Sequence, residues 1–229
     1  SILVEKPMVI SPDEVQLVGE KLKKHPEVIF MVAENYMYKP SLNDIKKILR
    51  SGNIGEPRKI YIQKQYMQNI HTWKKRYSAL YEGGIHFIAL LSALLSHARP
   101  TKIDSVFPRA REKEVERTSQ LTLRYEQKTS AIIKYSWETP SITKGFFQIS
   151  SIEGDKGKVW FESNGIFIWR QFGFPKFYFS DRSGYKNMSR DFVSCLLKGS
   201  TPQYGYNEAA VDLGVVFEAY AINQVPVSI

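Results

Sequence analysis

The chain has 229 residues, of which 43% are hydrophobic, and it carries a single cysteine. This composition can bury one sizeable core and excludes a disordered chain, while one cysteine excludes a disulfide framework within the chain. We therefore expect a reducing, cytoplasmic setting. No apolar run approaches the roughly 20 residues that a membrane-spanning helix needs, so no membrane partner is expected.

The net charge is +9, from 32 Lys and Arg against 23 Asp and Glu. Such a surplus can indicate a nucleic-acid partner. However, the basic residues are scattered, the densest runs (21–24 and 73–76) are short, and no nucleic-acid motif is present. We therefore expect a lysine-rich surface and no nucleic-acid binding.

The first 36 residues predict a strand, a helix and a second strand. Residues 2–4 are apolar and of β type, and the sequence Ser11-Pro12-Asp13-Glu14 is a capping box that opens a helix over 12–24. Residues 28–33 are continuously apolar, as in a strand buried on both faces. This βαβ order indicates a remnant of a Rossmann domain over residues 1–36, with something missing upstream of the first strand.

Residues 37–229 predict an α+β domain with a large, mainly antiparallel, open-faced sheet. A helix over 42–50 ends before Gly52, and a partly alternating strand follows over 59–66. Because the later strands are short and follow one another in series, we expect a meander. The remaining expected strands are 102–109, 117–126, 130–138, 144–152, 157–162 and 165–170, and the remaining helices are 84–95, 187–198 and 207–222.

An acid and a base lie together at the start of the helix over 84–95. Glu82 and His86 are four residues apart and would share one face of a helix. Gly83 and Gly84 carry no side chain, so a ligand could approach the backbone there. A lone histidine is more often a core or capping residue, but the neighbouring acid and glycines favour a functional site.

Five stretches, in this order, resemble the family of glucose-fructose oxidoreductase and inositol dehydrogenase (Gfo/Idh/MocA), which are NAD(P)-dependent oxidoreductases. Each stretch is a weak signal alone, but five in the family's order are specific, and they cover essentially the whole chain. They are Val4-Glu5-Lys6-Pro7-Met8, the helix and turn from Pro40 to Pro57, Gly84-x-His86-x-x-x-Leu90, Ile152–Gly157 and Asn207–Leu213.

The sequence departs from the family in two respects. The half of the Rossmann domain that precedes Glu-Lys-Pro, with its glycine-rich phosphate loop, is not in these 229 residues. The chain is therefore expected to be truncated and to bind NAD or NADP weakly or not at all by itself. The family's Asp four residues before the histidine is Glu82 here, and its second Asp is Ala89.

The resemblance implies roles for several residues. His86 would be the general acid/base, and Lys6 would hold the substrate hydroxyl beside the nicotinamide. Glu82 would orient His86 or the substrate, which makes Lys6, Glu82 and His86 the expected catalytic group. The residues expected at the cofactor are Glu5, Lys6, Pro7 and Tyr36.

The irregular stretch over residues 68–81 is aromatic and basic. We expect His71, Trp73 and Lys74 to line a polar substrate pocket, although an exposed loop is the plainer interpretation of His71. The four histidines and one cysteine lack the spacing of metal ligands, so no metal site is expected.

Two functions remain open at this point. The first is an NAD(P)-dependent oxidoreductase, truncated here, that acts on a sugar, a polyol or a similar hydroxy or carbonyl compound. The second is a non-catalytic binding, regulatory or assembly module of the same family. In both, we expect a homodimer or tetramer through the face of the sheet, whose apolar area would come from Trp160, Phe161, Phe167, Trp169 and residues 177–179.

Overall fold

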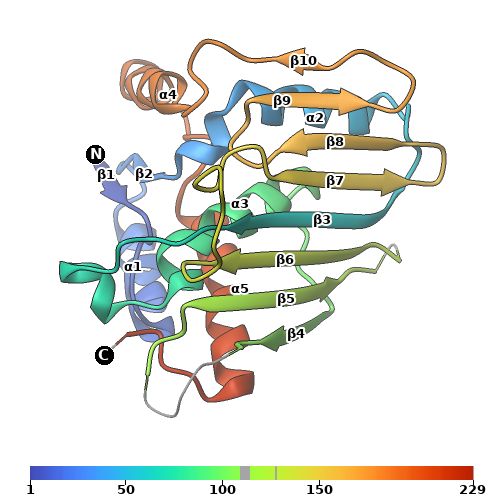
Figure 1. The fold of residues 1–229 in the computed structure, drawn as a ribbon. Coiled ribbons are helices and arrows are strands. Elements are labelled where there is room, and N and C mark those ends of the chain that lie inside the picture. Colours follow the sequence, from blue (N-terminus) through green and yellow to red (C-terminus); the bar gives the residue numbers. More distant parts are fainter. Residues whose placement is uncertain (109–113, 127, 229) are drawn as a thin grey trace.

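The computed structural model describes residues 1–108, 114–126 and 128–228, apart from the side chains of residues 72 and 73. They form a two-stranded sheet at one end and an eight-stranded sheet that makes up most of the molecule (Figure 1). Within these residues, every helix is too short or too polar to cross a membrane.

The N-terminal unit is the expected βαβ arrangement. Strand β1 (Ile2–Glu5) and strand β2 (Phe30–Ala33) run parallel, joined by helix α1 (Pro12–Lys24). The predicted N-cap is present, since the Ser11 hydroxyl accepts a hydrogen bond from the backbone N–H of Glu14, while the Glu14 carboxylate accepts from the Ile10 N–H rather than from Ser11. Strand β2 is mostly buried, whereas the Ile2 and Leu3 side chains on β1 are 47% and 46% exposed.

The large sheet is mainly antiparallel, as predicted, but it is not a simple meander. Its order is β10-β9-β8-β7-β3-β6-β5-β4, and β3 runs parallel to β6. The expectation of a plain meander was wrong because β3 lies between β6 and β7. Its parallel pairing with β6 needs a long crossover, which the chain supplies through α3, β4 and β5. The strands are β3 (Pro57–Gln65), β4 (Lys102–Val106), β5 (Thr118–Arg124), β6 (Ser130–Ser136), β7 (Ile149–Gly154), β8 (Lys158–Glu162), β9 (Phe167–Arg170) and β10 (Lys176–Phe177).

Helices cover one face of this sheet. Helices α2 (Pro40–Arg50), α3 (Ile85–Leu94) and α5 (Tyr206–Asn223) lie behind it in Figure 1, and α4 (Tyr185–Lys198) lies beside it. Alternate strand residues face these helices, so they are buried while their neighbours on the open side are not. Buried side chains from β2 to α5 join one hydrophobic core, so the domain boundary after residue 36 stays a prediction.

The open face of the sheet carries only part of the aromatic surface that the sequence predicts. Phe161 and Tyr178 are buried, at 2% and 7% exposure, because they point toward the helices. The residues that face outward include Trp160 and Trp169, whose rings lie 5.3 Å apart. An interface on this face would therefore use the tryptophan pair and its neighbours rather than the whole predicted set.

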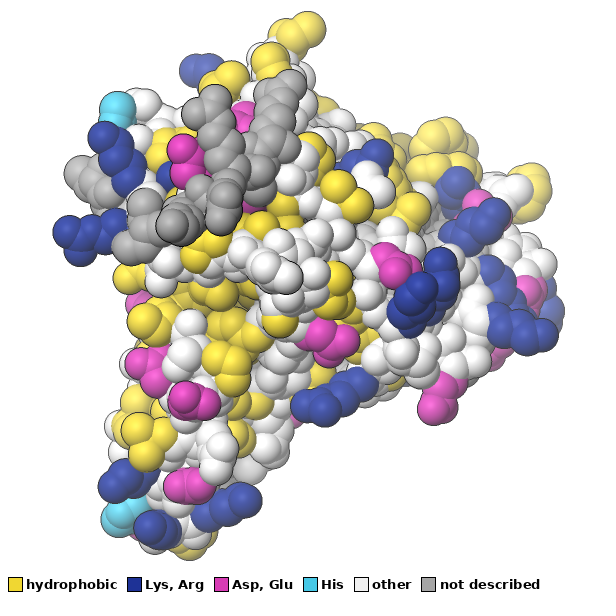
Figure 2. All heavy atoms as spheres, turned by 90° about the horizontal axis from the view of Figure 1, so that it is seen from below, with side chains coloured by type: hydrophobic (Ala, Val, Ile, Leu, Met, Phe, Trp, Pro, Cys, Tyr) yellow, Lys and Arg dark blue, Asp and Glu magenta, His cyan; other side chains and the backbone are white. Residues whose placement is uncertain are grey.

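Basic side chains do not gather into a stripe on the face shown in Figure 2. Lysine and arginine side chains are spread around the edges of this view, with acidic side chains between them. This pattern is typical of a solvated surface rather than of a phosphate-binding track.

A buried carboxyl group connects the start of the α3 region to α5. Glu116 is 0% exposed, and its Oε1 accepts hydrogen bonds from the Leu80 backbone N–H (2.6 Å) and the Tyr220 hydroxyl (2.8 Å). Its Oε2 has no hydrogen-bond partner among the described residues. Burial raises the pKa of Glu116 to about 7, although these hydrogen bonds act in the opposite direction.

The first prediction concerns this group and pH. The folded-state pKa of Glu116 lies above the unfolded value of 4.5, so ionisation of its carboxyl destabilises the folded protein. The stability that depends on the protonated carboxyl is fully present below about pH 4.5 and is lost as the pH rises through 7. Glu116→Gln keeps a neutral acceptor for both donors. The unfolding free energy of the variant minus that of the parent should therefore rise by about 2 kcal/mol from pH 5 to pH 8, measured by urea titration at each pH. A difference that does not change with pH would contradict a buried, titrating Glu116.

Candidate active site

A cavity of about 420 Å³ lies where the N-terminal unit meets the large sheet. It is lined by side chains from both, including Lys6, Tyr36, Lys64, Lys74, Glu82 and His86. Strands β1 and β2 are parallel, so their carboxyl ends lie at the same edge and bring the segments that follow them together. The structure therefore places most of the predicted site residues around one space.

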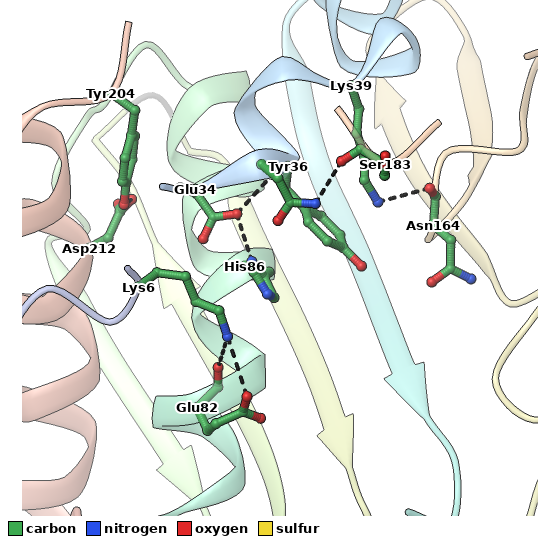
Figure 3. Close-up of polar contacts among 11 residues, drawn as sticks. Lys6, Glu34, Tyr36, Lys39, Glu82, His86, Asn164, Ser183, Tyr204 and Asp212 are labelled. Atoms are coloured by element: carbon green, nitrogen blue, oxygen red, sulfur yellow. Dashed lines mark hydrogen bonds and ion pairs between the residues drawn. The ribbon is translucent and has the colours of Figure 1, made fainter. Parts of the chain in front are cut away.

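His86 is held by a buried carboxylate (Figure 3). Its Nδ1 lies 2.6 Å from Oε1 of Glu34, which is 0% exposed and also accepts from the Tyr36 backbone N–H at 3.0 Å. Burial alone would raise the pKa of Glu34, but the charge and hydrogen bond of His86 hold it below its usual value. An ionised carboxylate can only accept, so Nδ1 donates and Nε2 is the nitrogen left for chemistry.

Glu34 is the residue that the sequence analysis missed. Of the two roles expected for Glu82, orienting His86 is not observed, because the histidine turns toward Glu34. A signal was available in the sequence: Glu34 directly follows the buried strand β2, at the edge where parallel sheets place functional groups.

Glu82 contacts Lys6 instead. The Lys6 ammonium donates to the Glu82 backbone carbonyl at 2.6 Å and lies 3.4 Å from its carboxylate Oε1. Both side chains are mostly buried, at 17% and 16% exposure. This contact connects the end of β1 to the segment before α3 and fixes where the ammonium lies (Figure 3).

The segment that carries Glu82 is π-helical rather than the regular helix that the sequence indicates. It spans Leu80–Gly84 (η3) and continues into α3. A Cβ on Gly83 would lie 2.0 Å from the Tyr135 hydroxyl oxygen, so this glycine is required by a packed side chain. Gly83 also lines the cavity, so the expectation that a ligand can approach the backbone there stays a prediction. Single π-helical turns are frequent at functional sites.

Tyr36 and Lys39 form a column on His86. The rings of Tyr36 and His86 stack with centroids 4.6 Å apart and an interplanar angle of 17°. The Lys39 ammonium lies 3.2 Å from the centroid of the Tyr36 ring and donates to the Asn164 backbone carbonyl at 2.8 Å. Burial lowers the pKa of Lys39 to about 7. Tyr36 thus packs against one face of the imidazole, whereas Glu34 holds its edge at Nδ1.

Two of the residues expected at the cofactor lie apart from the cavity. Glu5 is exposed and Pro7 is partly exposed, and neither lines the cavity, although Lys6, which lies between them in the sequence, does. The Lys6–Pro7 peptide bond is cis. Tyr36 is the other expected cofactor residue that lines the cavity.

The predicted substrate residues divide in the same way. Lys74 lines the cavity and donates to the Gln68 side-chain carbonyl at 2.7 Å. His71 is exposed at the start of the short helix η2 (Thr72–Arg76) and does not line it. The Trp73 side chain lies outside the described part of the chain. Among the described residues, no group of three or more His, Cys, Asp or Glu side chains could hold a metal ion.

Solved structures with this fold are oxidoreductases. The aldose-aldose oxidoreductase of Caulobacter crescentus, solved with glycerol, matches with a TM-score of 0.81 and 17% identity over 97% of this chain and 69% of that one. An oxidoreductase of Thermotoga maritima matches with 0.79 and 19% over 99% and 69%. The WlbA dehydrogenase of Chromobacterium violaceum, solved with NADH and UDP-GlcNAcA, matches with 0.77 and 18% over 99% and 70%.

The family model of the GFO/IDH/MocA C-terminal domain matches residues 42–159, which is more than half of the chain. The chain therefore belongs to the GFO/IDH/MocA family, as its motifs indicate. A comparison with curated protein sequences finds no match.

The second prediction tests the packing of the π-helical segment. Gly83→Ala would place a methyl group against the Tyr135 hydroxyl, and relief requires moving a buried ring that lines the cavity. We expect a loss of about 1–3 kcal/mol in unfolding free energy, measured by thermal or urea unfolding. Gly214→Ala, in α5, is the matched control: nothing lies within 4 Å of its added Cβ, so it should stabilise by up to about 1 kcal/mol. Equal effects at both positions would contradict the steric account.

Proposed function

We propose that this chain carries the substrate-binding and proton-transferring part of an NAD(P)-dependent oxidoreductase that acts on the CH–OH group of a sugar, polyol or similar compound. The observation that carries this proposal is the Glu34–His86 pair beside the Lys6 ammonium at the carboxyl end of two parallel strands. Relatives solved with glycerol, or with NADH and a UDP-sugar, support the same reaction class.

Three side chains have separate roles in the proposed proton transfer. His86 Nε2 takes the proton of the substrate hydroxyl when the alcohol is oxidised and returns it in the reverse direction. The buried Glu34 carboxylate keeps the proton on Nδ1 and stabilises the imidazolium that forms. The Lys6 ammonium, fixed by Glu82, stabilises the negative charge that develops on the substrate oxygen.

The residues present fit one end of the nicotinamide cofactor. We propose that Lys6 and Tyr36 would lie beside the nicotinamide ring, and the cofactor, when bound, would supply the hydride chemistry. Ile2 and Leu3, neighbours on β1 that point to opposite faces of the small sheet, are both nearly half exposed, which fits further elements that cover these faces. Since no G-x-G-x-x-G motif follows a strand in these 229 residues, we propose that this chain alone binds NADH or NADPH weakly or not at all.

The alternative is a non-catalytic module of the same family. Ala89 takes the place of an acid in the family's motif and is fully buried among apolar side chains, which favours a structural role for that turn of α3. The outward Trp160–Trp169 pair supports a homodimer or tetramer through the open face of the sheet in either case. Turnover by the whole protein separates the two functions.

The third prediction concerns turnover. In the whole protein, His86→Ala should lower kcat by about 10²–10⁴-fold with little change in KM, because the base acts in the transition state. Glu34→Gln should lower kcat by about 10–100-fold, because the amide no longer enforces the proton on Nδ1. Both are measured by the absorbance of the reduced nicotinamide.

His25→Ala is the matched control, since this histidine is exposed just after α1 and its side chain pairs with the exposed Glu27, away from the cavity lining. Its turnover should equal that of the parent. A His86→Ala variant with normal kcat and a raised KM would assign the histidine to binding and remove it from proton transfer.

A further inference from the structure

The cavity carries more positive charge than the proposed chemistry uses. Four lysines line it, Lys6, Lys64, Lys74 and Lys144, and Glu82 is the one carboxylate among the described lining residues. Lys6 is paired with Glu82, and hydride transfer from a neutral alcohol needs no further cation. Lys64, the buried amine among the others, therefore needs a separate explanation.

Lys64 is the most deeply placed of these amines. It lies on the central strand β3 at 7% exposure, and its ammonium donates to the Gly145 carbonyl at 2.6 Å and to the Asn164 side-chain oxygen at 2.7 Å. Both acceptors are neutral. An ammonium has three donors, so one donor of Lys64 has no hydrogen-bonded partner within the described structure.

A nearby carboxylate positions Lys64 without pairing with it. The two oxygens of Glu162 accept hydrogen bonds from the Asn164 side-chain amide (2.7 Å), the Asn164 backbone N–H (2.8 Å) and the Ile166 backbone N–H (3.2 Å). This arrangement turns the amide so that its oxygen faces Lys64. The carboxylate is thereby occupied by neutral donors, and its attraction for the ammonium acts only through space.

A second buried ammonium lies behind the first. Lys39 is 5% exposed and uses the other oxygen of Asn164, its backbone carbonyl, at 2.8 Å. Burial lowers the pKa of Lys64 to about 8 and that of Lys39 to about 7, and each of these pKa values would be higher if a bound anion compensated the charge. Glu162 and Glu34 attract these ammonium groups only through space, so the cost of removing the ammonium groups from water is only partly compensated and the free cavity favours an anionic ligand.

The walls around Lys64 also fit a ring-shaped ligand. Its ammonium lies 4.9 Å from the centroid of the Tyr66 ring and 5.5 Å from that of Phe146, both of which line the cavity. These two rings offer apolar surface beside the Lys64 ammonium. The cavity volume of about 420 Å³ is suited to a small ligand.

We propose that the substrate of this site is an acidic sugar or polyol, and that Lys64 binds its carboxylate or phosphate while the hydroxyl to be oxidised faces His86. This inference rests on the proposed function for the position of the reacting hydroxyl. The anion preference itself rests on the charges of the cavity and can be measured in this chain without a cofactor.

The test is direct binding to this chain by calorimetry, at low salt and pH 7. The probes are a panel of hexuronates, hexonates and hexose phosphates, each beside its neutral hexose or polyol. We expect at least one acid to bind at least tenfold more tightly than its neutral counterpart, and the panel shows whether a carboxylate or a phosphate is preferred. If no acid binds more tightly than its counterpart, the proposal is wrong.

Variants on one strand assign the preference to Lys64. Lys64→Met should abolish it, whereas Lys59→Met, on the exposed side of β3, should retain it. The parent chain offers a second measurement if the buried variant folds poorly: raising the pH from 7 to 9 should weaken binding of the acid as Lys64 loses its proton. A preference that survives both changes would overturn the role of Lys64.

Turnover by the whole protein separates this inference from the proposed function. Binding of an acid with no oxidation of any member of the panel would uphold the inference and remove the proposed function. Equal oxidation of neutral and acidic sugars would uphold the proposed function and overturn the inference.

Discussion

The buried Glu34 carboxylate is the constraint on which the site depends. A charge at 0% exposure needs compensation, and the described structure provides it through His86 and one backbone N–H. Glu34 follows β2 in the parallel unit, whereas His86 lies on α3 beneath the large sheet. The same pair therefore orients the imidazole and joins two parts of the chain that are 52 residues apart.

The buried ammonium groups of the site are also held in place by neighbouring groups. These groups are mainly neutral oxygens, so the positive charges can still act on a ligand. Lys6 is fixed mainly by a backbone carbonyl, and Lys64 and Lys39 by the neutral oxygens of Asn164. None of these three ammonium groups is neutralised by a close carboxylate, apart from the 3.4 Å contact of Lys6 with Glu82. The cost of burying them is met by packing elsewhere in the core, as is common at functional sites.

Local patterns in the sequence predict the elements well, because periodicity, capping residues and turn glycines act over a few residues. The N-cap at Ser11 and the helix before Gly52 are examples. The position of β3 could not be predicted, since its partners are distant in sequence. The role of Gly83 could not be predicted either, since it is set by Tyr135, which is distant in sequence. Glu34 did carry a signal, its position directly after β2, but the sequence does not show that His86 is its partner.

The parallel pairing of β3 with β6 has a consequence for how the protein folds. Ile60 pairs with Ala131 on one side and with Ile152 on the other, so the central strand has no sequence-local partner. The hairpins β5–β6 and β7–β8 can form early, but both must find β3 before the sheet is continuous, and such high contact order slows folding. Because Lys64 lies on β3, the part of the cavity around its ammonium is complete only after both hairpins have joined this strand.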